Sequence, residues 1–91
     1  MLRIQRLQGG EEVTLTVSGG LIDGYVAELE RVVDAEGGEQ SLVLNLKEVT
    51  HVTRDGVRLL ARLEISGARI LACPEYLREW ISRERDYLST A

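Results

Sequence analysis

Residues 41–65, SLVLNLKEVTHVTRDGVRLLARLEI, decide the fold. They open with an apolar run, LVLNL at residues 42–46, which is typical of a central strand covered on both faces. The polar segment KEVTHVT at residues 47–53 predicts a turn, and apolar residues at helical spacing then predict a helix from about Asp55 to Ile65. Gly56 lies near the middle of its apolar face, where it would let the helix approach the sheet closely. In α/β proteins, the turn after such a strand commonly carries functional residues.

Two strand-like runs and a helical run precede this stretch. Residues 2–8 and residues 13–17 flank the Gly9–Gly10 turn, so they predict an antiparallel hairpin. The Gly19–Gly20 pair is expected to end the hairpin, and Gly37–Gly38 is expected to end the following helix. The apolar stripe of that helix consists of Ile22, Val26, Leu29 and Val33.

A short strand and a last helix are predicted to follow. Residues 68–73, ARILAC, form an apolar run, and Pro74 suits the first position of a helix whose pattern weakens after Arg83. That helix is expected to bury Tyr76, Leu77, Trp80 and Ile81. The order β-β-α-β-α-β-α predicts an α/β fold, with a mixed, mainly parallel four-stranded sheet packed by three helices in one domain over residues 1–91.

Composition restricts the classes of function. The net charge of −4 argues against a nucleic-acid binder. Met1 is not followed by the apolar segment of a signal peptide, and no apolar run approaches the ~20 residues of a membrane span. The single Cys73 fits a reducing compartment, so we expect a cytoplasmic protein. Aromatic residues are scarce, so the core should be aliphatic.

Four segments resemble the STAS domain of bacterial anti-sigma factor antagonists: VSGGL at residues 17–21, LVLNLKEV at residues 42–49, GVRLL at residues 56–60 and SGARIL at residues 66–71. Together with the element order, the resemblance covers roughly residues 2–82. It implies a protein-interaction module of signalling and transcription regulation. Its partner would be a regulatory protein, either an anti-sigma-type kinase or a larger signalling assembly.

The phosphorylation motif of that family is degenerate here. The family carries Asp-Ser/Thr-x-Gly before its second helix, and this chain reads Thr53-Arg54-Asp55-Gly56. Arg54 thus occupies the position of the phosphorylated hydroxyl, and Thr53, in the Asp position, is only a weak candidate. The acid of the first helix is replaced by Ile22. The resemblance therefore implies a module that phosphorylation at this position does not switch.

Arg54, Arg58 and Arg62 recur every four residues and define an arginine row opposite the leucine face of the predicted helix. One interpretation is a solvated helix face with local pairs, such as Asp55 with Arg58. The other is a docking surface for an acidic partner, since arginine binds carboxylates through a bidentate fork. The predicted partner-binding residues are this row with Thr53 and Asp55. Thr53 is also expected to cap the helix through its hydroxyl, and Asp55 to complement the helix dipole.

No catalytic or metal-binding pattern is present, so we expect neither an enzyme nor a cofactor. His51 is interpreted as a surface or turn residue and Cys73 as a buried, inert thiol. The leading function is a non-catalytic interaction module. One alternative is a small-ligand sensor that holds a nucleotide or anion at Arg54. Another is an assembly subunit, for example a homodimer, acting through an exposed edge at residues 68–73, unless residues 85–91 fold back over that edge.

Overall fold

The structure, a computed structural model, describes residues 1–36 and 40–90. Its elements, in chain order, are β1 (Leu2–Gly9), β2 (Glu12–Leu21), α1 (Gly24–Ala35), β3 (Ser41–Val52), α2 (Arg54–Ile65), β4 (Arg69–Leu71) and α3 (Glu75–Thr90). Within the described residues, no helix is both long and apolar enough to cross a membrane. The Gly37–Gly38 pair that was predicted to end the first helix lies outside the described residues.

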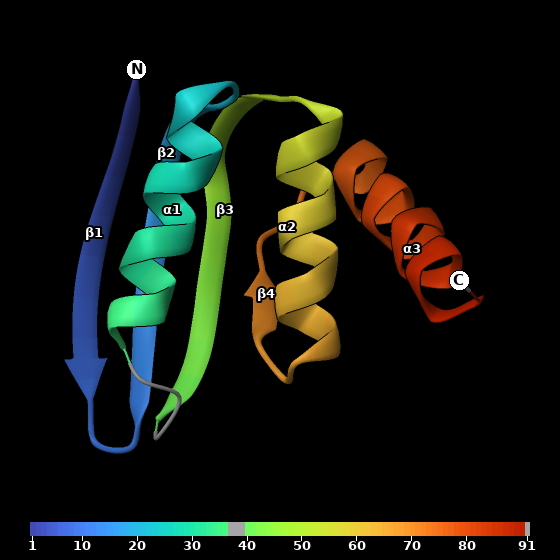
Figure 1. Cartoon of the computed structure of the whole chain (residues 1–91). Coiled ribbons are helices and arrows are strands. Elements are labelled where there is room, and N and C mark those ends of the chain that lie inside the picture. Colours follow the sequence, from blue (N-terminus) through green and yellow to red (C-terminus); the bar gives the residue numbers. More distant parts are fainter. Residues whose placement is uncertain (37–39, 91) are drawn as a thin grey trace.

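The four strands form one mixed sheet in the order β1-β2-β3-β4. β1 and β2 form the predicted antiparallel hairpin, and the β2–β3 and β3–β4 pairs are parallel. Figure 1 shows α1 and α2 side by side on one face of the sheet, with α3 beyond α2. The predicted α/β fold class and the β-β-α-β-α-β-α order are therefore confirmed.

The core lies between the sheet and the helices and is aliphatic, as composition predicted. Val13, Leu15 and Val17 on β2 point to the helices and are at most 1% exposed. They meet Leu44 and Leu46 of β3 in the same cluster. The helices complete the cluster with Leu29, Val57, Leu59, Leu60, Ala61, Leu77 and Ile81. Removal of this apolar surface from water is the main force that holds the layers together.

The prediction that β3 is covered on both faces was wrong in one respect, because the described helices lie on one side. Val43 pairs with Thr14 and Arg69, so it faces away from α1 and α2. It is nevertheless only 1% exposed. An ion pair of 3.5 Å joins Arg69 on β4 to Glu12 on β2 and therefore spans β3 on this face. Neighbouring side chains, rather than a helix layer, bury Val43.

Both parallel strands run further than predicted. The segment at residues 47–53 was expected to be a turn, but β3 continues to Val52. β2 likewise continues through Gly19–Gly20 to Leu21. The added pairs include Val49 with Gly19 and Val52 with Leu21, with register shifts on either side of Ser18–Gly19. Such irregularities let a strand bend while pairing continues, and β-branched residues favour the strand. The turn before α2 is thereby reduced to Thr53.

Helix α3 is longer, and β4 shorter, than predicted. α3 continues to Thr90 instead of weakening after Arg83, since Leu88 still packs against the core. β4 comprises residues 69–71 rather than 68–73. Residues 85–90 therefore add no strand to β4, which remains an edge of the sheet. Tyr76 was expected to be buried but is 56% exposed, because Leu77 and Ile81 supply the fully buried contacts of α3.

Candidate functional site

The start of α2 is fixed by a close contact with β2. Thr53 N–H donates to the carbonyl of Leu21 at 3.2 Å, and α2 begins at the next residue. A Cβ added to Gly56 would lie 2.7 Å from the Leu21 carbonyl oxygen and 2.9 Å from Val52 Cγ2. The prediction that Gly56 allows a close approach to the sheet is confirmed. This contact sets the position of the side chains in the first turns of α2.

Thr53 occupies the N-cap position, but its hydroxyl does not cap the helix. Oγ1 is buried without a hydrogen-bond partner, so the predicted side-chain cap was wrong. The extended backbone of Thr53 is the usual one for an N-cap residue, and its carbonyl accepts the Val57 N–H at 3.0 Å, so it is the side chain and not the backbone that fails to cap. Asp55 lies in the first turn of α2, where a carboxylate complements the helix dipole as predicted.

The arginine row lies on the outer side of α2, between α1 and α3. Arg54 Nε is 3.3 Å from Glu84 Oε1, and Arg58 Nε is 3.6 Å from Glu84 Oε2. The ion partner of Arg58 is thus an acid of α3 and not Asp55, the neighbour that the sequence suggested. Glu84 itself is buried, with 7% of its surface exposed. The carboxylate of Glu84 therefore forms ion pairs with two of the three arginines.

The third arginine of the row is paired with α1. Arg62 is 3.6 Å from Glu30, and both side chains are about half exposed. The side chains of Arg54 and Arg62 are 60% and 57% exposed, and that of Arg58 is 38% exposed. The row is therefore accessible from solvent although each member has an acid of its own chain nearby. The Arg62–Glu30 pair, with both side chains exposed, contributes little stability, about 0–1 kcal/mol.

Neither of the two acids that meet the row was predicted from the sequence. Glu30 and Glu84 lie far from the row along the chain, so no local spacing could pair them with it. A usable signal existed for Glu84. It falls on the buried stripe of α3 at spacing i, i+4, i+7 and i+11, in line with Leu77, Ile81 and Leu88. A charged residue at a core position needs a partner, and the arginines of the neighbouring helix supply it.

A groove of about 480 Å³ runs beside the row, between α1 and α2. Arg58 and Arg62 line it together with three acids, and Leu88 from the end of α3 also lines it. The full lining is Asp23, Val26, Ala27, Glu30, Asp55, Arg58, Arg62 and Leu88. Its mixed charges suit a protein surface with both polar and apolar groups. Three carboxylates so close together disfavour a simple anion as its ligand.

A second ion-pair cluster fastens α3 to α2 further along. The Arg78 guanidinium donates to both oxygens of Glu64 at 2.7 and 2.6 Å, and Arg85 adds a contact of 2.9 Å. These hydrogen bonds, first that from Arg78, lower the pKa of the Glu64 carboxyl. The same bond raises the pKa of Arg78. Bidentate geometry of this length is the strong form of the arginine–carboxylate pair.

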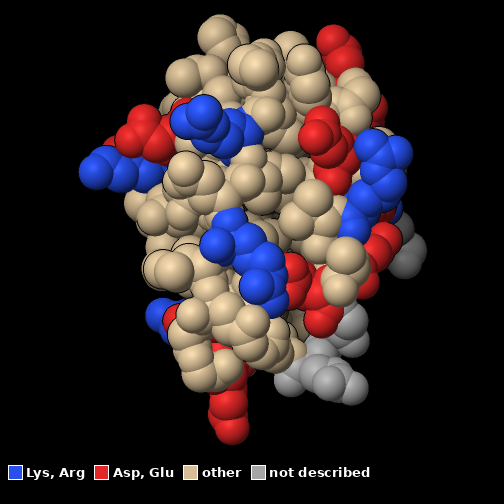
Figure 2. Space-filling view, turned by 90° about the vertical axis from the view of Figure 1, so that its left-hand side faces the viewer, with Lys and Arg blue, Asp and Glu red and all other residues tan. Residues whose placement is uncertain are grey.

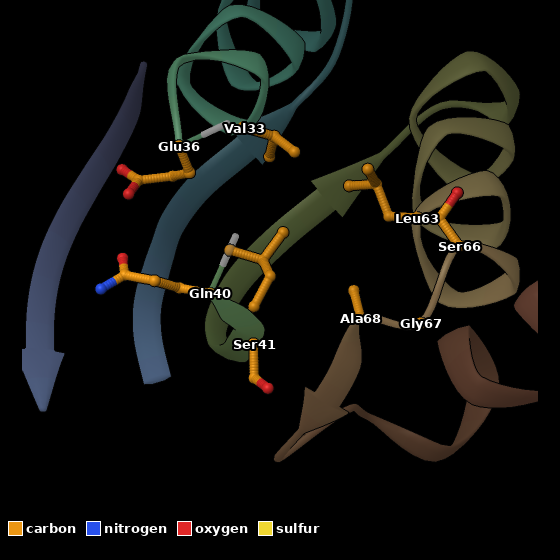
Figure 3. A pocket seen from close by; sticks show the side chains of 9 residues that line it. Val33, Glu36, Gln40, Ser41, Leu63, Ser66, Gly67 and Ala68 are labelled. Carbon is orange, nitrogen blue, oxygen red and sulfur yellow. The ribbon is translucent and has the colours of Figure 1, made fainter. Parts of the chain in front are cut away.

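A separate hollow of about 370 Å³ lies between the ends of α1 and α2 and the start of β3. Val33, Leu42, Leu63 and Ala68 form its apolar part. Figure 3 shows that the polar ends of Glu36 and Gln40 point away from it, toward β1. Glu36 is already held there by Arg6 on β1, at 2.8 Å. The charged group of Glu36 therefore does not point into the hollow, where a ligand would lie.

The remaining single candidates show no reactive arrangement. Cys73 is half-buried rather than fully buried, and desolvation raises the pKa of its thiol. His51 is exposed on β3, not in a turn, with Nδ1 3.2 Å from the Thr50 hydroxyl. Among the described residues, no three His, Cys, Asp or Glu side chains come together as a metal site would require.

On the β1 side of the molecule, the surface charge is interspersed rather than gathered. Figure 2 shows the β1 side of the molecule, where blue and red groups lie next to each other among uncharged residues. This side therefore lacks the gathered basic residues of a nucleic-acid-binding face. Comparison of the chain with protein-family models and with curated proteins found no match. The arginine row and the adjoining groove are the features on which a functional proposal can be built.

Proposed function

We propose that this chain is a non-catalytic, STAS-like protein-interaction module of bacterial signalling. It would dock a regulatory protein, an anti-sigma-type kinase or a signalling assembly, through the arginine row with Thr53 and Asp55. The observation that carries the proposal is the row itself. Three guanidinium groups share one side of α2, and each is solvent-accessible beside an acid of its own chain.

The lengths of these ion pairs leave the arginines able to bind a partner. The three contacts measure 3.3–3.6 Å. Strong charge-assisted hydrogen bonds between arginine and a carboxylate measure about 2.7–2.9 Å. Each arginine carries five N–H donors, so most of the donors in the row are available to carboxylates of another protein. Complementary charge of this kind speeds association and selects the partner.

Two further observations support the STAS-like interpretation. The element order β-β-α-β-α-β-α and the position of the row, directly after a central parallel strand, agree with the resemblance of the segments quoted above. Arg54 stands where the family carries the phosphorylated hydroxyl. We therefore propose a module whose docking is not switched by phosphorylation at this position.

The alternatives receive less support. An anion or nucleotide sensor would need an electropositive pocket, whereas the groove beside the row carries three acids against two arginines. Assembly through the β4 edge would rest on a strand of three residues, which offers few backbone hydrogen bonds to another chain. Both features favour a side-chain-mediated protein contact at α2.

Affinity capture with matched double variants tests the proposal. Arg58→Gln/Arg62→Gln removes two charges from the row. Arg69→Gln/Arg83→Gln removes the same charge from exposed positions on β4 and α3 and serves as the control. We expect proteins from the native cell to be retained by the wild type and the control and lost from the row variant. Circular dichroism verifies that all three chains are folded. Retention of the same proteins by the row variant would refute the proposal.

A further inference from the structure

The last turns of α3 lie against the docking surface proposed above. Glu84 meets Arg54 and Arg58, and one helical turn later Leu88 lines the groove beside the row. We infer that this end of α3 is a built-in competitor, which occupies the surface until a partner displaces it. The inference rests on the proposed function and adds to it the chemistry of the partner and a means of control.

The contact of Glu84 is incompletely satisfied. Glu84 Oε2 and Arg58 Nε are both buried without a hydrogen-bond partner, although the two atoms are 3.6 Å apart. A buried carboxylate that loses water without gaining full hydrogen bonding is costly to the folded state. A partner carboxylate that reached the same arginines at normal hydrogen-bond length would therefore compete well against it.

The two ends of α3 differ in how firmly they are held. Leu77 and Ile81 are fully buried, and Arg78 forms its bidentate pair with Glu64 in the same part of the helix. Beyond Glu84, Leu88 is only partly buried, and Arg85 donates one hydrogen bond to Glu64, at 2.9 Å, where Arg78 donates two. The end of α3 can thus leave the surface while its first half keeps the core closed.

The end of α3, which occupies the docking surface, also indicates the chemistry of the partner. Glu84 and Leu88 are four residues apart, so they project from the same side of a helix. The arginine row accepts the acid, and the groove accepts the apolar side chain. The partner that fits is an amphipathic helical segment with a carboxylate at one position and leucine or a similar residue four positions later.

A labelled peptide with the sequence of residues 75–90 is the probe. Its binding to the full chain is measured by fluorescence anisotropy. The Glu84→Gln/Leu88→Ala chain should bind it at least about tenfold more tightly than the wild type, because its own helix no longer fills the surface. The control Glu79→Gln/Leu71→Ala makes the same chemical changes at exposed positions. Affinities within about twofold across all three chains would refute the inference.

Two further measurements make the test specific. Addition of Arg58→Gln to the Glu84→Gln/Leu88→Ala chain should remove the gain, and a gain that survives would refute the inference. Hydrogen exchange of the wild type needs no substitution. Amides of residues 86–90 should exchange faster than those of residues 78–82. Equal protection of the two segments would count against release of the end of α3 from the docking surface.

The outcomes separate this inference from the proposed function. If the row variant loses the captured proteins but the peptide shows no gain, the competitor is refuted and the docking surface stands. If the row variant keeps the captured proteins, the docking surface is refuted whatever the peptide does.

Discussion

Replacement of Gly56 by alanine tests how the sheet positions α2. The added Cβ would lie 2.7 Å from the Leu21 carbonyl oxygen and 2.9 Å from Val52 Cγ2. The first of these atoms is backbone and cannot rotate away. α2 must therefore move outward from β2, or β2 must bend, and either change loosens the packing of Val57 and Leu60 in the core.

The expected magnitude is the balance of two effects. Overpacking of a close-packed interior costs about 1–3 kcal/mol. Alanine recovers up to about 1 kcal/mol of helix propensity relative to glycine. Because the nearest atom is backbone, the cost for Gly56→Ala should lie in the upper part of that range, about 2–3 kcal/mol, so the net expectation is a loss of about 1–2 kcal/mol in the free energy of unfolding. For a domain of this size, that loss corresponds to a fall of about 4–16 °C in Tm.

Urea and thermal denaturation followed by circular dichroism measure the effect. Gly24→Ala is the matched control, because Gly24 begins α1 and no heavy atom lies within 4 Å of a Cβ added there. We expect the control to be as stable as the wild type or slightly more stable. A Gly56→Ala chain that matched the Gly24→Ala chain in stability would refute the close approach and the positioning of the arginine row derived from it.

Three further predictions concern single side chains. The hydrogen bond from Arg78 lowers the pKa of Glu64 in the folded chain, so its carboxylate stabilises the fold above the unfolded pKa, and this contribution is lost as the pH falls through the lower folded pKa. Urea titrations between about pH 7 and pH 3 should therefore show a smaller loss of stability for Glu64→Gln than for the wild type. Thr53→Val should be neutral or stabilising by up to about 1 kcal/mol in urea titrations, because the hydroxyl it removes is buried and unpaired, whereas loss of a true cap would cost about 1 kcal/mol. Burial raises the pKa of Cys73, so its reaction with a thiol reagent near neutral pH should be slower than that of free cysteine and should accelerate on unfolding.

The fold could be predicted because its signals are local and repeated. Three patterns consist of side chains that are largely buried in the structure: the alternation of Val13, Leu15 and Val17, the apolar run at residues 42–46, and the helical spacing after Gly56. The predicted ends of β2 and β3 were wrong because local turn signals there compete with pairing between the two strands. The Gly19–Gly20 pair and the segment at residues 47–53 read as turns, but pairing between β2 and β3 holds both in the sheet.

The candidate site could be predicted only in part. The four-residue spacing of Arg54, Arg58 and Arg62 places them on one side of a helix, and the structure agrees. Their acids could not be paired with them, since Glu30 and Glu84 come from helices whose positions depend on the whole core. The hydroxyl of Thr53 was misjudged because an N-cap backbone allows a side-chain cap but does not fix the side-chain rotamer, and in the structure Oγ1 is buried without a partner.

The sequence by itself therefore determined the element order, the aliphatic core and the arginine row, since each depends on periodicity within a single segment. Only the tertiary structure decided that α3 lies against that row. Its position follows from the burial of Leu77 and Ile81 against α2, which brings Glu84 to two arginines that lie about 30 residues away along the chain. Contacts across such separations are set by the packing of the layers, which no local pattern contains.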